Sequence, residues 1–254
     1  LVQSRPGWSV DIYCRGSQGE VCPGVRRLHV PAIDRDGWIA TQYARVGHRA
    51  RIFLRTRIDA ECLSFTLGLA PRFLSTRYDV VFNQAGPFSG WLLRLRRRAD
   101  GTPFIQKTAS GYGEIELLMA SQEPDAVVAT SPYVQGWLSD RVDGVRVECI
   151  PNAVDCSAFR PFTPEEMEAS RNGHDLSRIR RPLVLFVGAM DPMKRPGLLI
   201  SAVSRLPDVS LAMIGEGRLT ASVVGLGRDL LGERFLHVPR VSREKMPYYY
   251  NSCD

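Results

Sequence analysis

The stretch PLVLFVGAMDPMKRPGLLISAV, residues 182–203, decides the fold class of this chain. Its first part, PLVLFVG, is an almost continuous apolar run, which is typical of a strand that is buried on both faces. Gly188 ends the run, and a helix is predicted to begin near residue 195 after a short loop. A buried strand followed directly by a helix favours a parallel sheet with helices on both faces.

The same alternation of short apolar runs and amphipathic stretches continues through most of the chain. It predicts an α/β fold with parallel sheets and right-handed crossover connections. The predicted strands are residues 9–14, 25–30, 78–84, 103–108, 125–131, 145–150, 182–188, 209–215 and 234–238, and the predicted helices lie near residues 49–69, 87–98, 112–121, 132–140, 163–171, 195–206, 218–232 and 242–252.

A polar segment near residues 155–181, which contains Pro, Gly and many charges, separates six predicted strands from three. We therefore predict two Rossmann-like domains, an N-terminal one over residues 1–160 and a C-terminal one over residues 161–254. The sequence begins with Leu and ends directly after a predicted helix, so we expect further sequence at both ends and a second domain that is truncated.

The composition of the 254-residue chain, with 44% hydrophobic and 24% charged residues, is that of an ordinary globular protein. No stretch approaches the roughly 20 apolar residues of a membrane-spanning helix, so an integral membrane protein is not expected. The six cysteines are scattered without C-x-x-C spacing, which favours reduced thiols and a cytoplasmic location. The spacing of Cys and His also predicts no metal site.

Basic residues are concentrated between Arg45 and Arg98, where eleven Arg stand against three acidic residues. Such a segment is either a solvated surface or a docking site for an anionic partner. The run WLLRLRRRA, residues 91–99, mixes apolar and basic side chains, which suits peripheral contact with an anionic membrane. Nucleic acid is less favoured as a partner, because aromatic residues are not interleaved with the basic ones.

Ligands of open parallel sheets bind at the carboxyl ends of the strands, so the residues that follow each strand are the candidate site. Gly188 would let the backbone approach a ligand closely, and Lys194 places a cation where the next helix begins. Together they could hold a phosphate or diphosphate. Equally, Gly188 could only form the turn while Lys194 is a surface charge.

Two further strand ends offer weaker candidates. Gly215 and Glu216 follow the predicted strand at residues 209–215, and an acidic side chain there could hold a ribose hydroxyl or an amine. Val241, beyond the strand at residues 234–238, could lie against a flat base. The same reasoning places strand ends of the first domain near Asn83, Gly86 and Ser110 on the opposite wall of a cleft. No Ser/His/Asp arrangement is indicated by the spacing.

Four segments in order carry a family resemblance: IPNAVDCSAFRPF from residue 150, LVLFVGAMDPMKRPGLLISAVSRL from residue 183, VSLAMIGEGRL from residue 209 and FLHVPRVSREKMPYYYNSCD from residue 235. They resemble the IPNGVD-x-x-x-F, VGRL-x-P-x-KG and VGDGP motifs and the final Y-x-x-AD segment of family 4 retaining glycosyltransferases, which have the GT-B fold. The resemblance covers residues 75–254 well and residues 1–74 loosely.

The resemblance implies an enzyme that transfers a sugar from a nucleotide-sugar donor to a sugar or lipid-linked acceptor, with retention of configuration. The donor would bind the C-terminal domain and the acceptor the N-terminal domain, where Asn83, Gly86 and Ser110 are the acceptor-side candidates. Lys194 matches the residue that holds the donor diphosphate and is the catalytic candidate. The implied donor-binding residues are Gly188, Ala189, Lys194, Gly215, Glu216, Arg240 and Val241. No cofactor or metal is implied.

Three departures from the family pattern stand out. Ala189 occupies the place of an Arg that contacts phosphate, and Ala109 or Ser110 replaces a first-domain His. A glycine-rich loop and a Glu-x7-Glu segment would lie outside residues 1–254, so the chain as given is expected to be inactive. Two other functions stay open: a non-catalytic GT-B-like module that binds nucleotide-sugars, and a nucleotide-sugar epimerase.

Overall fold

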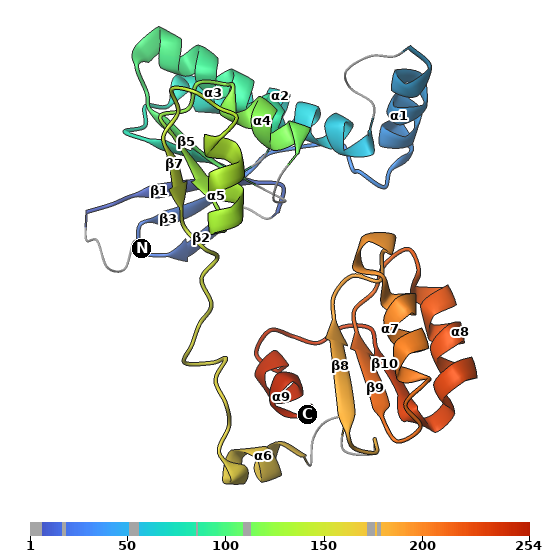
Figure 1. Cartoon of the computed structure of the whole chain (residues 1–254). Helices are drawn as coiled ribbons and strands as arrows, with labels where there is room; N and C mark the ends of the chain where they lie inside the picture. Colours follow the sequence, from blue (N-terminus) through green and yellow to red (C-terminus); the bar gives the residue numbers. More distant parts are fainter. Residues whose placement is uncertain are drawn as a thin grey trace. The chain divides into compact units, whose positions relative to one another are not determined.

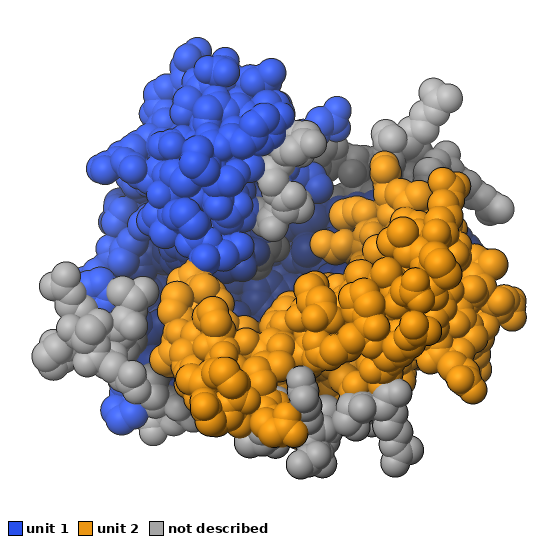
Figure 2. Space-filling view, turned by 60° about the horizontal axis from the view of Figure 1, so that its bottom comes forward, with its two compact units in different colours: residues 1–152 blue, residues 153–254 orange. Residues whose placement is uncertain are grey.

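The computed structural model describes residues 7–16, 19–50, 56–84, 86–108, 113–171, 176 and 179–254. The chain divides into two compact units, Leu1–Asn152 (unit 1) and Ala153–Asp254 (unit 2), which are coloured separately in Figure 2. Each unit is described by itself. In the described part of the chain, no helix has both the length and the apolar character needed to cross a membrane.

Unit 1 begins with a three-stranded sheet in the order β1-β3-β2. Strands β1 (Val10–Cys14) and β3 (Val25–His29) are parallel, whereas β2 (Gly19–Cys22) is antiparallel to β3. The expectation of parallel strands alone is therefore wrong here. Gly24, with a φ of 81°, turns the chain between β2 and β3, and β2 was missed because GEVC is short and shows no apolar periodicity.

Two helices follow instead of the single helix predicted near residues 49–69. They are α1 (Trp38–Ala50) and α2 (Arg57–Ser75). A capping box starts α2: Thr56 Oγ1 accepts a hydrogen bond from the Asp59 backbone at 3.1 Å, and Asp59 Oδ2 accepts one from the Thr56 backbone at 2.7 Å. This T-x-x-D signal fixes the helix start, because it satisfies backbone donors that have no partner within the helix.

The second sheet of unit 1 follows the predicted βα alternation. Its strands β4 (Val81–Asn83), β5 (Phe104–Lys107), β6 (Ala126–Ala129) and β7 (Val147–Cys149) are all parallel and lie in that order. Helices α3 (Pro87–Asp100), α4 (Glu114–Ala120) and α5 (Pro132–Ser139) connect them, as Figure 1 shows. The sheet is therefore parallel, as predicted, but only its inner strands are well buried, because Phe82 in the edge strand β4 is 54% exposed.

Unit 2 contains a parallel sheet in the order β10-β9-β8. Its elements, in chain order, are α6 (Pro164–Arg171), β8 (Leu183–Val187), η2 (Pro192–Lys194), α7 (Pro196–Val203), β9 (Ser210–Ile214), α8 (Thr220–Leu231), η3 (Gly232–Arg234), β10 (Phe235–Val238) and α9 (Met246–Asn251). Helices α7 and α8 cover one face of the sheet and α9 covers the other (Figure 1).

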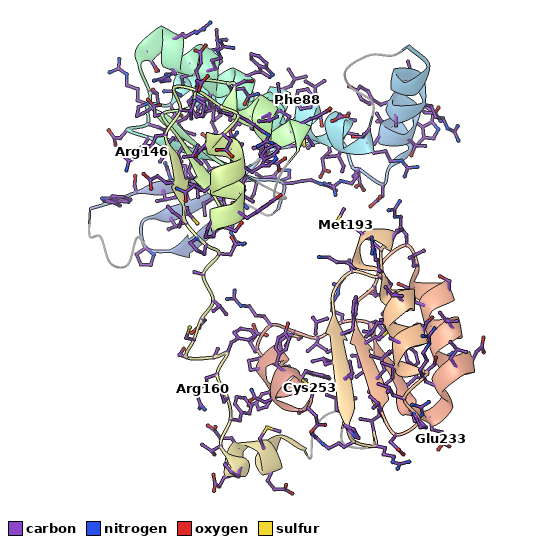
Figure 3. The ribbon with its side chains drawn as sticks, viewed as in Figure 1. Phe88, Arg146, Arg160, Met193, Glu233 and Cys253 are labelled. Atoms are coloured by element: carbon purple, nitrogen blue, oxygen red, sulfur yellow. The ribbon has the colours of Figure 1, made fainter. Side chains whose placement is uncertain are left out.

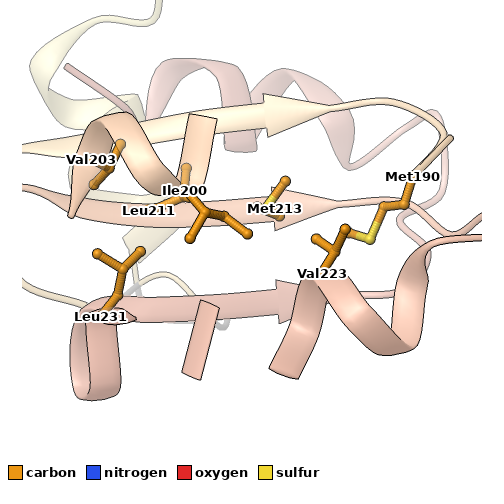
Figure 4. Close-up of a cluster of buried hydrophobic side chains, with 7 residues drawn as sticks. All are labelled: Met190, Ile200, Val203, Leu211, Met213, Val223 and Leu231. Atoms are coloured by element: carbon orange, nitrogen blue, oxygen red, sulfur yellow. The ribbon is translucent and has the colours of Figure 1, made fainter. Parts of the chain in front are cut away.

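The central strand β9 is buried along its whole length. Leu211 and Met213 face the core under α7 and α8, which Figure 4 shows with Met190, Ile200, Val203, Val223 and Leu231. Ala212 and Ile214 face the opposite core, together with Leu183, Val238 and Tyr249. Because successive side chains of a strand point to opposite faces, this strand supplies both cores at once. The loops that follow β8 and β9 are therefore anchored in the most buried part of the unit.

Candidate functional site

The carboxyl ends of β8, β9 and β10 are held together by backbone hydrogen bonds. The Gly188 backbone donates to the Ile214 carbonyl at 3.0 Å, and the Gly215 backbone donates to the Val238 carbonyl at 3.0 Å. Gly188 and Gly215, both predicted site residues, thus lie side by side at one edge of the sheet.

The packing of the two loops requires a glycine at only one of these two positions. Gly215 has a φ of 130°, and a β-carbon on it would lie 2.1 Å from the Gly188 carbonyl oxygen, so this position requires glycine for the packing of the two loops. A β-carbon on Gly188 would meet nothing closer than the Phe186 ring at 3.6 Å. Packing therefore does not explain Gly188, and its predicted role in close approach to a ligand remains a prediction.

A second pair of contacts ties the β8 loop to the β9 loop. The Met190 backbone donates to the Glu216 carbonyl at 3.2 Å, and the Leu219 backbone donates to the Met190 carbonyl at 2.9 Å. A β-carbon on Gly217 would lie 2.7–2.8 Å from the Met190 backbone. Gly217 was not among the predicted site residues, although the G-x-G spacing in the sequence was a usable signal for it. Ala189 lies between Gly188 and Met190, the two residues whose backbones are hydrogen-bonded to the end of β9 and to the loop that follows it.

Lys194 closes the short η2 turn, where its backbone donates to the Asp191 carbonyl at 3.0 Å. The Asp191 carboxylate is engaged by the other loop, because its Oδ1 accepts from the Arg218 backbone at 3.2 Å and from Arg218 Nε at 3.4 Å. The exposed Lys194 ammonium forms no hydrogen bond or ion pair with another described residue. Met193, labelled on the same turn in Figure 3, is 88% exposed.

This arrangement can attract an anion to the edge of the sheet. A solvent-facing ammonium without a carboxylate partner has no ion pair to break before it meets a phosphate. Glu216, the predicted acidic residue, is also exposed on the neighbouring loop and leaves its carboxylate available to hydrogen-bond donors. The structure thus brings Gly188, Lys194, Gly215 and Glu216 onto adjoining loops.

His237 contributes to the site in a way that sequence reasoning missed. It lies in β10, an edge strand of the sheet, and its side chain is half-buried. Its Nε2 lies 2.9 Å from the Gly215 carbonyl oxygen. The imidazole thereby fixes the carbonyl at the start of the β9 loop. The strand alternation gave no signal for this contact, because it depends on which residues are neighbours across the sheet.

The predicted base-side residues follow β10. Arg240 is exposed, and Val241 is half-buried against the core that contains Ala212, Ile214 and Val238. Val241 therefore packs on its own sheet with part of its surface. Contact of either residue with a nucleotide base remains a prediction.

The acceptor-side candidates of unit 1 that the structure describes lie in a buried polar network. Asn83 Nδ2 donates to Gln106 Oε1 at 2.9 Å, and the single Ser89 hydroxyl hydrogen is shared between two acceptors, Asn83 Oδ1 at 2.8 Å and the Gly86 carbonyl at 2.9 Å. Gly86, with a φ of 95°, is the residue before α3. These contacts stabilise the end of β4 against α3. Ser110 and Ala109 lie outside the described residues.

Within the described ranges, no group of three or more His, Cys, Asp or Glu side chains could hold a metal ion. Cys14, Cys62, Cys149, Cys156 and Cys253 are free thiols.

Comparison with known proteins shows a relative along almost the whole chain. No protein-family model matches the sequence. A protein named D-inositol 3-phosphate glycosyltransferase from Xylanimonas cellulosilytica is 25% identical over 288 residues, which cover 99% of this chain and 65% of that protein. The chain thus spans just under two thirds of the length of this curated relative.

Solved structures share the fold at low sequence identity. WaaG, described as a glycosyltransferase involved in lipopolysaccharide biosynthesis, matches with a TM-score of 0.63 at 13% identity over 100% of this chain and 66% of that chain. Anabaena Alr3699/HepE, in complex with UDP and glucose, matches with a TM-score of 0.57 at 15% identity over 91% and 59%. A putative UDP-N-acetylglucosamine 2-epimerase from Listeria monocytogenes gives 0.51 at 12% over 82% and 61%.

These likenesses establish the fold class. The chain is an α/β protein of the GT-B type, built from Rossmann-like parts, as the sequence predicted. The assignment of unit 1 to the acceptor and unit 2 to the donor remains a prediction. The structure divides the chain after residue 152 rather than at residue 160.

Proposed function

We propose that the chain is part of a glycosyltransferase that moves a sugar from a nucleotide-sugar to an acceptor, with retention of configuration. The observation that carries the proposal is the pair of interlocked loops after β8 and β9, with the Lys194 ammonium exposed beside them. Backbone hydrogen bonds and tight glycine packing hold these loops in place before any ligand binds. A fixed loop backbone with a cation at its edge suits a departing diphosphate.

Each proposed donor-side residue has a distinct role. Lys194 would bind the diphosphate and stabilise the negative charge that develops when the bond to the sugar breaks. Glu216 would accept hydrogen bonds from hydroxyl groups of the donor. Gly188 would let the donor approach the backbone, and Arg240 with Val241 would contact the base.

The named relatives support this class of reaction. One curated relative is named a D-inositol 3-phosphate glycosyltransferase, and one structural neighbour was solved with UDP and glucose. We therefore propose a UDP-sugar as the first donor to assay and an inositol phosphate as the first acceptor. Sugar and lipid-linked acceptors remain alternatives. No resident cofactor or metal is part of the proposal.

Titration of the chain with UDP, GDP and ADP by calorimetry tests the donor site. At least one of these nucleoside diphosphates should bind. Lys194→Ala should lower the affinity for it by about 10-fold or more, because a hydrogen bond to a charged group contributes about 1.5–3 kcal/mol. Arg205→Ala is the matched control: this exposed cation follows the opposite end of α7. Equal affinity of Lys194→Ala and the unaltered chain would remove the proposed phosphate site.

Two other functions would give different results in the same assays. An epimerase, as in the structural neighbour from Listeria, would convert a UDP-sugar into its isomer without an acceptor. A non-catalytic binding module would bind the diphosphate but transfer nothing in the full-length protein. Transfer to an acceptor, with the product anomer determined by NMR, would support the proposal and its retaining stereochemistry together.

We also propose a cytoplasmic protein that contacts an anionic membrane through helix α1 of unit 1. Trp38, Ile39 and Val46 are 74%, 57% and 61% exposed on this helix, and Arg45 beside them is exposed too. Apolar side chains next to a cation suit the boundary between lipid headgroups and acyl chains.

The basic side chains of α3 are less available for contact with an anionic membrane than the sequence indicates. Arg98 pairs with Glu123 at 3.1 Å, Arg97 pairs with Asp125 at 2.8 Å, and Arg96 is buried. Ion pairs within the fold reduce the charge that this helix presents to a membrane. The proposed contact therefore centres on α1 rather than on residues 91–99.

A further inference from the structure

Arg195, which directly follows Lys194, has an unusual backbone conformation. Its φ and ψ are both 47°, in the left-handed region that favours glycine. An L-residue pays a steric cost there, and Pro196, the first residue of α7, restricts the preceding backbone further. A strained residue persists where its side chain or its position is needed.

One other non-glycine residue in the described ranges has a positive φ, and its side chain has a structural explanation. Glu123, with a φ of 60°, pairs with Arg94 and with Arg98, the latter at 3.1 Å. The Arg195 side chain, by contrast, is exposed and forms no hydrogen bond or ion pair with any described residue. The fold as described therefore uses the Glu123 carboxylate but not the Arg195 guanidinium.

No acidic side chain of this loop pairs with the Arg195 guanidinium, so the guanidinium can bind an anion. Asp191, the acidic residue of the same turn, is occupied by Arg218 through contacts at 3.2 and 3.4 Å. Ala189 brings no charge to the loop. Lys194 and Arg195 are consecutive, so the side chains that carry the ammonium and the guanidinium are attached to adjacent residues. A diphosphate carries several negative oxygens on two linked phosphoryl groups, which suit two adjacent cations.

We infer that Arg195 is a donor-binding residue whose guanidinium contacts the diphosphate beside Lys194. It supplies a second cation on a loop where Ala189 brings no charge. The inference rests on the proposed function, because the diphosphate is that of the nucleotide-sugar. It also gives a reason for an arginine at a position where glycine would be less strained.

Three substitutions separate charge from backbone strain. Arg195→Ala should weaken the binding of the preferred diphosphate, chosen among UDP, GDP and ADP, by about 10-fold to 100-fold. Arg195→Lys should keep most of the affinity, because it keeps a cation. Arg195→Gly should weaken binding as much as Arg195→Ala, yet raise the Tm of the chain by about 2 °C or more, because glycine adopts this φ without strain.

Calorimetry on the whole chain distinguishes the inference from the proposal on which it rests. The corresponding nucleoside, which lacks phosphate, should bind the unaltered chain and Arg195→Ala equally, and Arg205→Ala should bind the diphosphate normally. If no diphosphate binds the unaltered chain, the proposed function is overturned. If a diphosphate binds and Arg195→Ala binds it equally well, the proposed function stands and the role of Arg195 is overturned.

Discussion

A β-carbon on Gly215 would lie 2.1 Å from the carbonyl oxygen of Gly188, so the loops after β8 and β9 fit together only while residue 215 is glycine. The φ of 130° at this position adds a second restriction, because residues with a side chain rarely adopt it. Both restrictions involve backbone atoms, which cannot move aside as a flexible side chain can.

Gly215→Ala should therefore lower the free energy of unfolding of unit 2 by at least about 2 kcal/mol, through strain and overpacking. Denaturant unfolding followed by circular dichroism measures the change. Gly225→Ala is the matched control: this glycine lies within α8 with no atom within 4 Å of its would-be β-carbon. The control should be neutral or stabilising by up to about 1 kcal/mol. Equal stabilities for the two variants would contradict the packing argument.

His237 should contribute to stability through its contact with the Gly215 carbonyl, at 2.9 Å. His237→Leu keeps much of the side-chain volume but removes the donor, and it should lower the free energy of unfolding by about 1 kcal/mol. It should also weaken diphosphate binding, because the β9 loop is no longer fixed at its start. An unchanged affinity together with reduced stability would show that the contact is purely structural.

Glu166 should make the stability of unit 2 depend on acid pH. Two hydrogen bonds from Arg160, at 2.6 and 2.9 Å, and one from the Thr163 backbone at 2.9 Å lower the pKa of this carboxyl group to about 2. The unfolded value is higher, so the stabilisation is complete above about pH 4.5 and is lost as the pH falls toward 2.

Glu166→Gln should consequently have a lower Tm than the unaltered chain near neutral pH, and this difference should shrink as the pH falls from 4.5 toward 2. Thermal unfolding at a series of pH values measures it. Glu233→Gln is the control, because Glu233, labelled in Figure 3, forms no hydrogen bond with another described residue. A difference that stays constant with pH would contradict the role of the Glu166 carboxylate.

Helix α1 should bind vesicles of phosphatidylglycerol at low salt and release them as salt is added, while vesicles of phosphatidylcholine should bind weakly. Trp38→Ser should reduce the bound fraction in flotation experiments. Trp8→Ser, which alters another exposed tryptophan of unit 1, should not. Failure of the unaltered chain to float with the anionic vesicles would end the membrane proposal.

The fold could be predicted from the sequence where strands are apolar on both faces, as in LVLFV of β8 and SLAMI of β9. Strand β2 escaped prediction because its four residues carry no apolar pattern. Helix α2 was predicted to start too early, since the capping box at Thr56 was not used. Local signals therefore set the boundaries of these elements more sharply than hydrophobic periodicity does.

The candidate site was predictable only in part. The positions of Gly188 after β8 and of Lys194 before α7 could be predicted, because both follow from the order of elements along the chain. The contribution of Gly217 depends on the Met190 backbone, and that of His237 on the Gly215 carbonyl. Each of these partners lies on a neighbouring strand or loop, and no spacing along a single sequence encodes such a distance.

Strand β9 has no exposed residue, and it supports loops whose tips carry the exposed residues Glu216 and Arg218. The buried strand and the exposed loop residues are thus separated by only a few positions of the chain. Under the proposed function, exchanging these loop residues should change which anionic donor is preferred while the sheet stays intact.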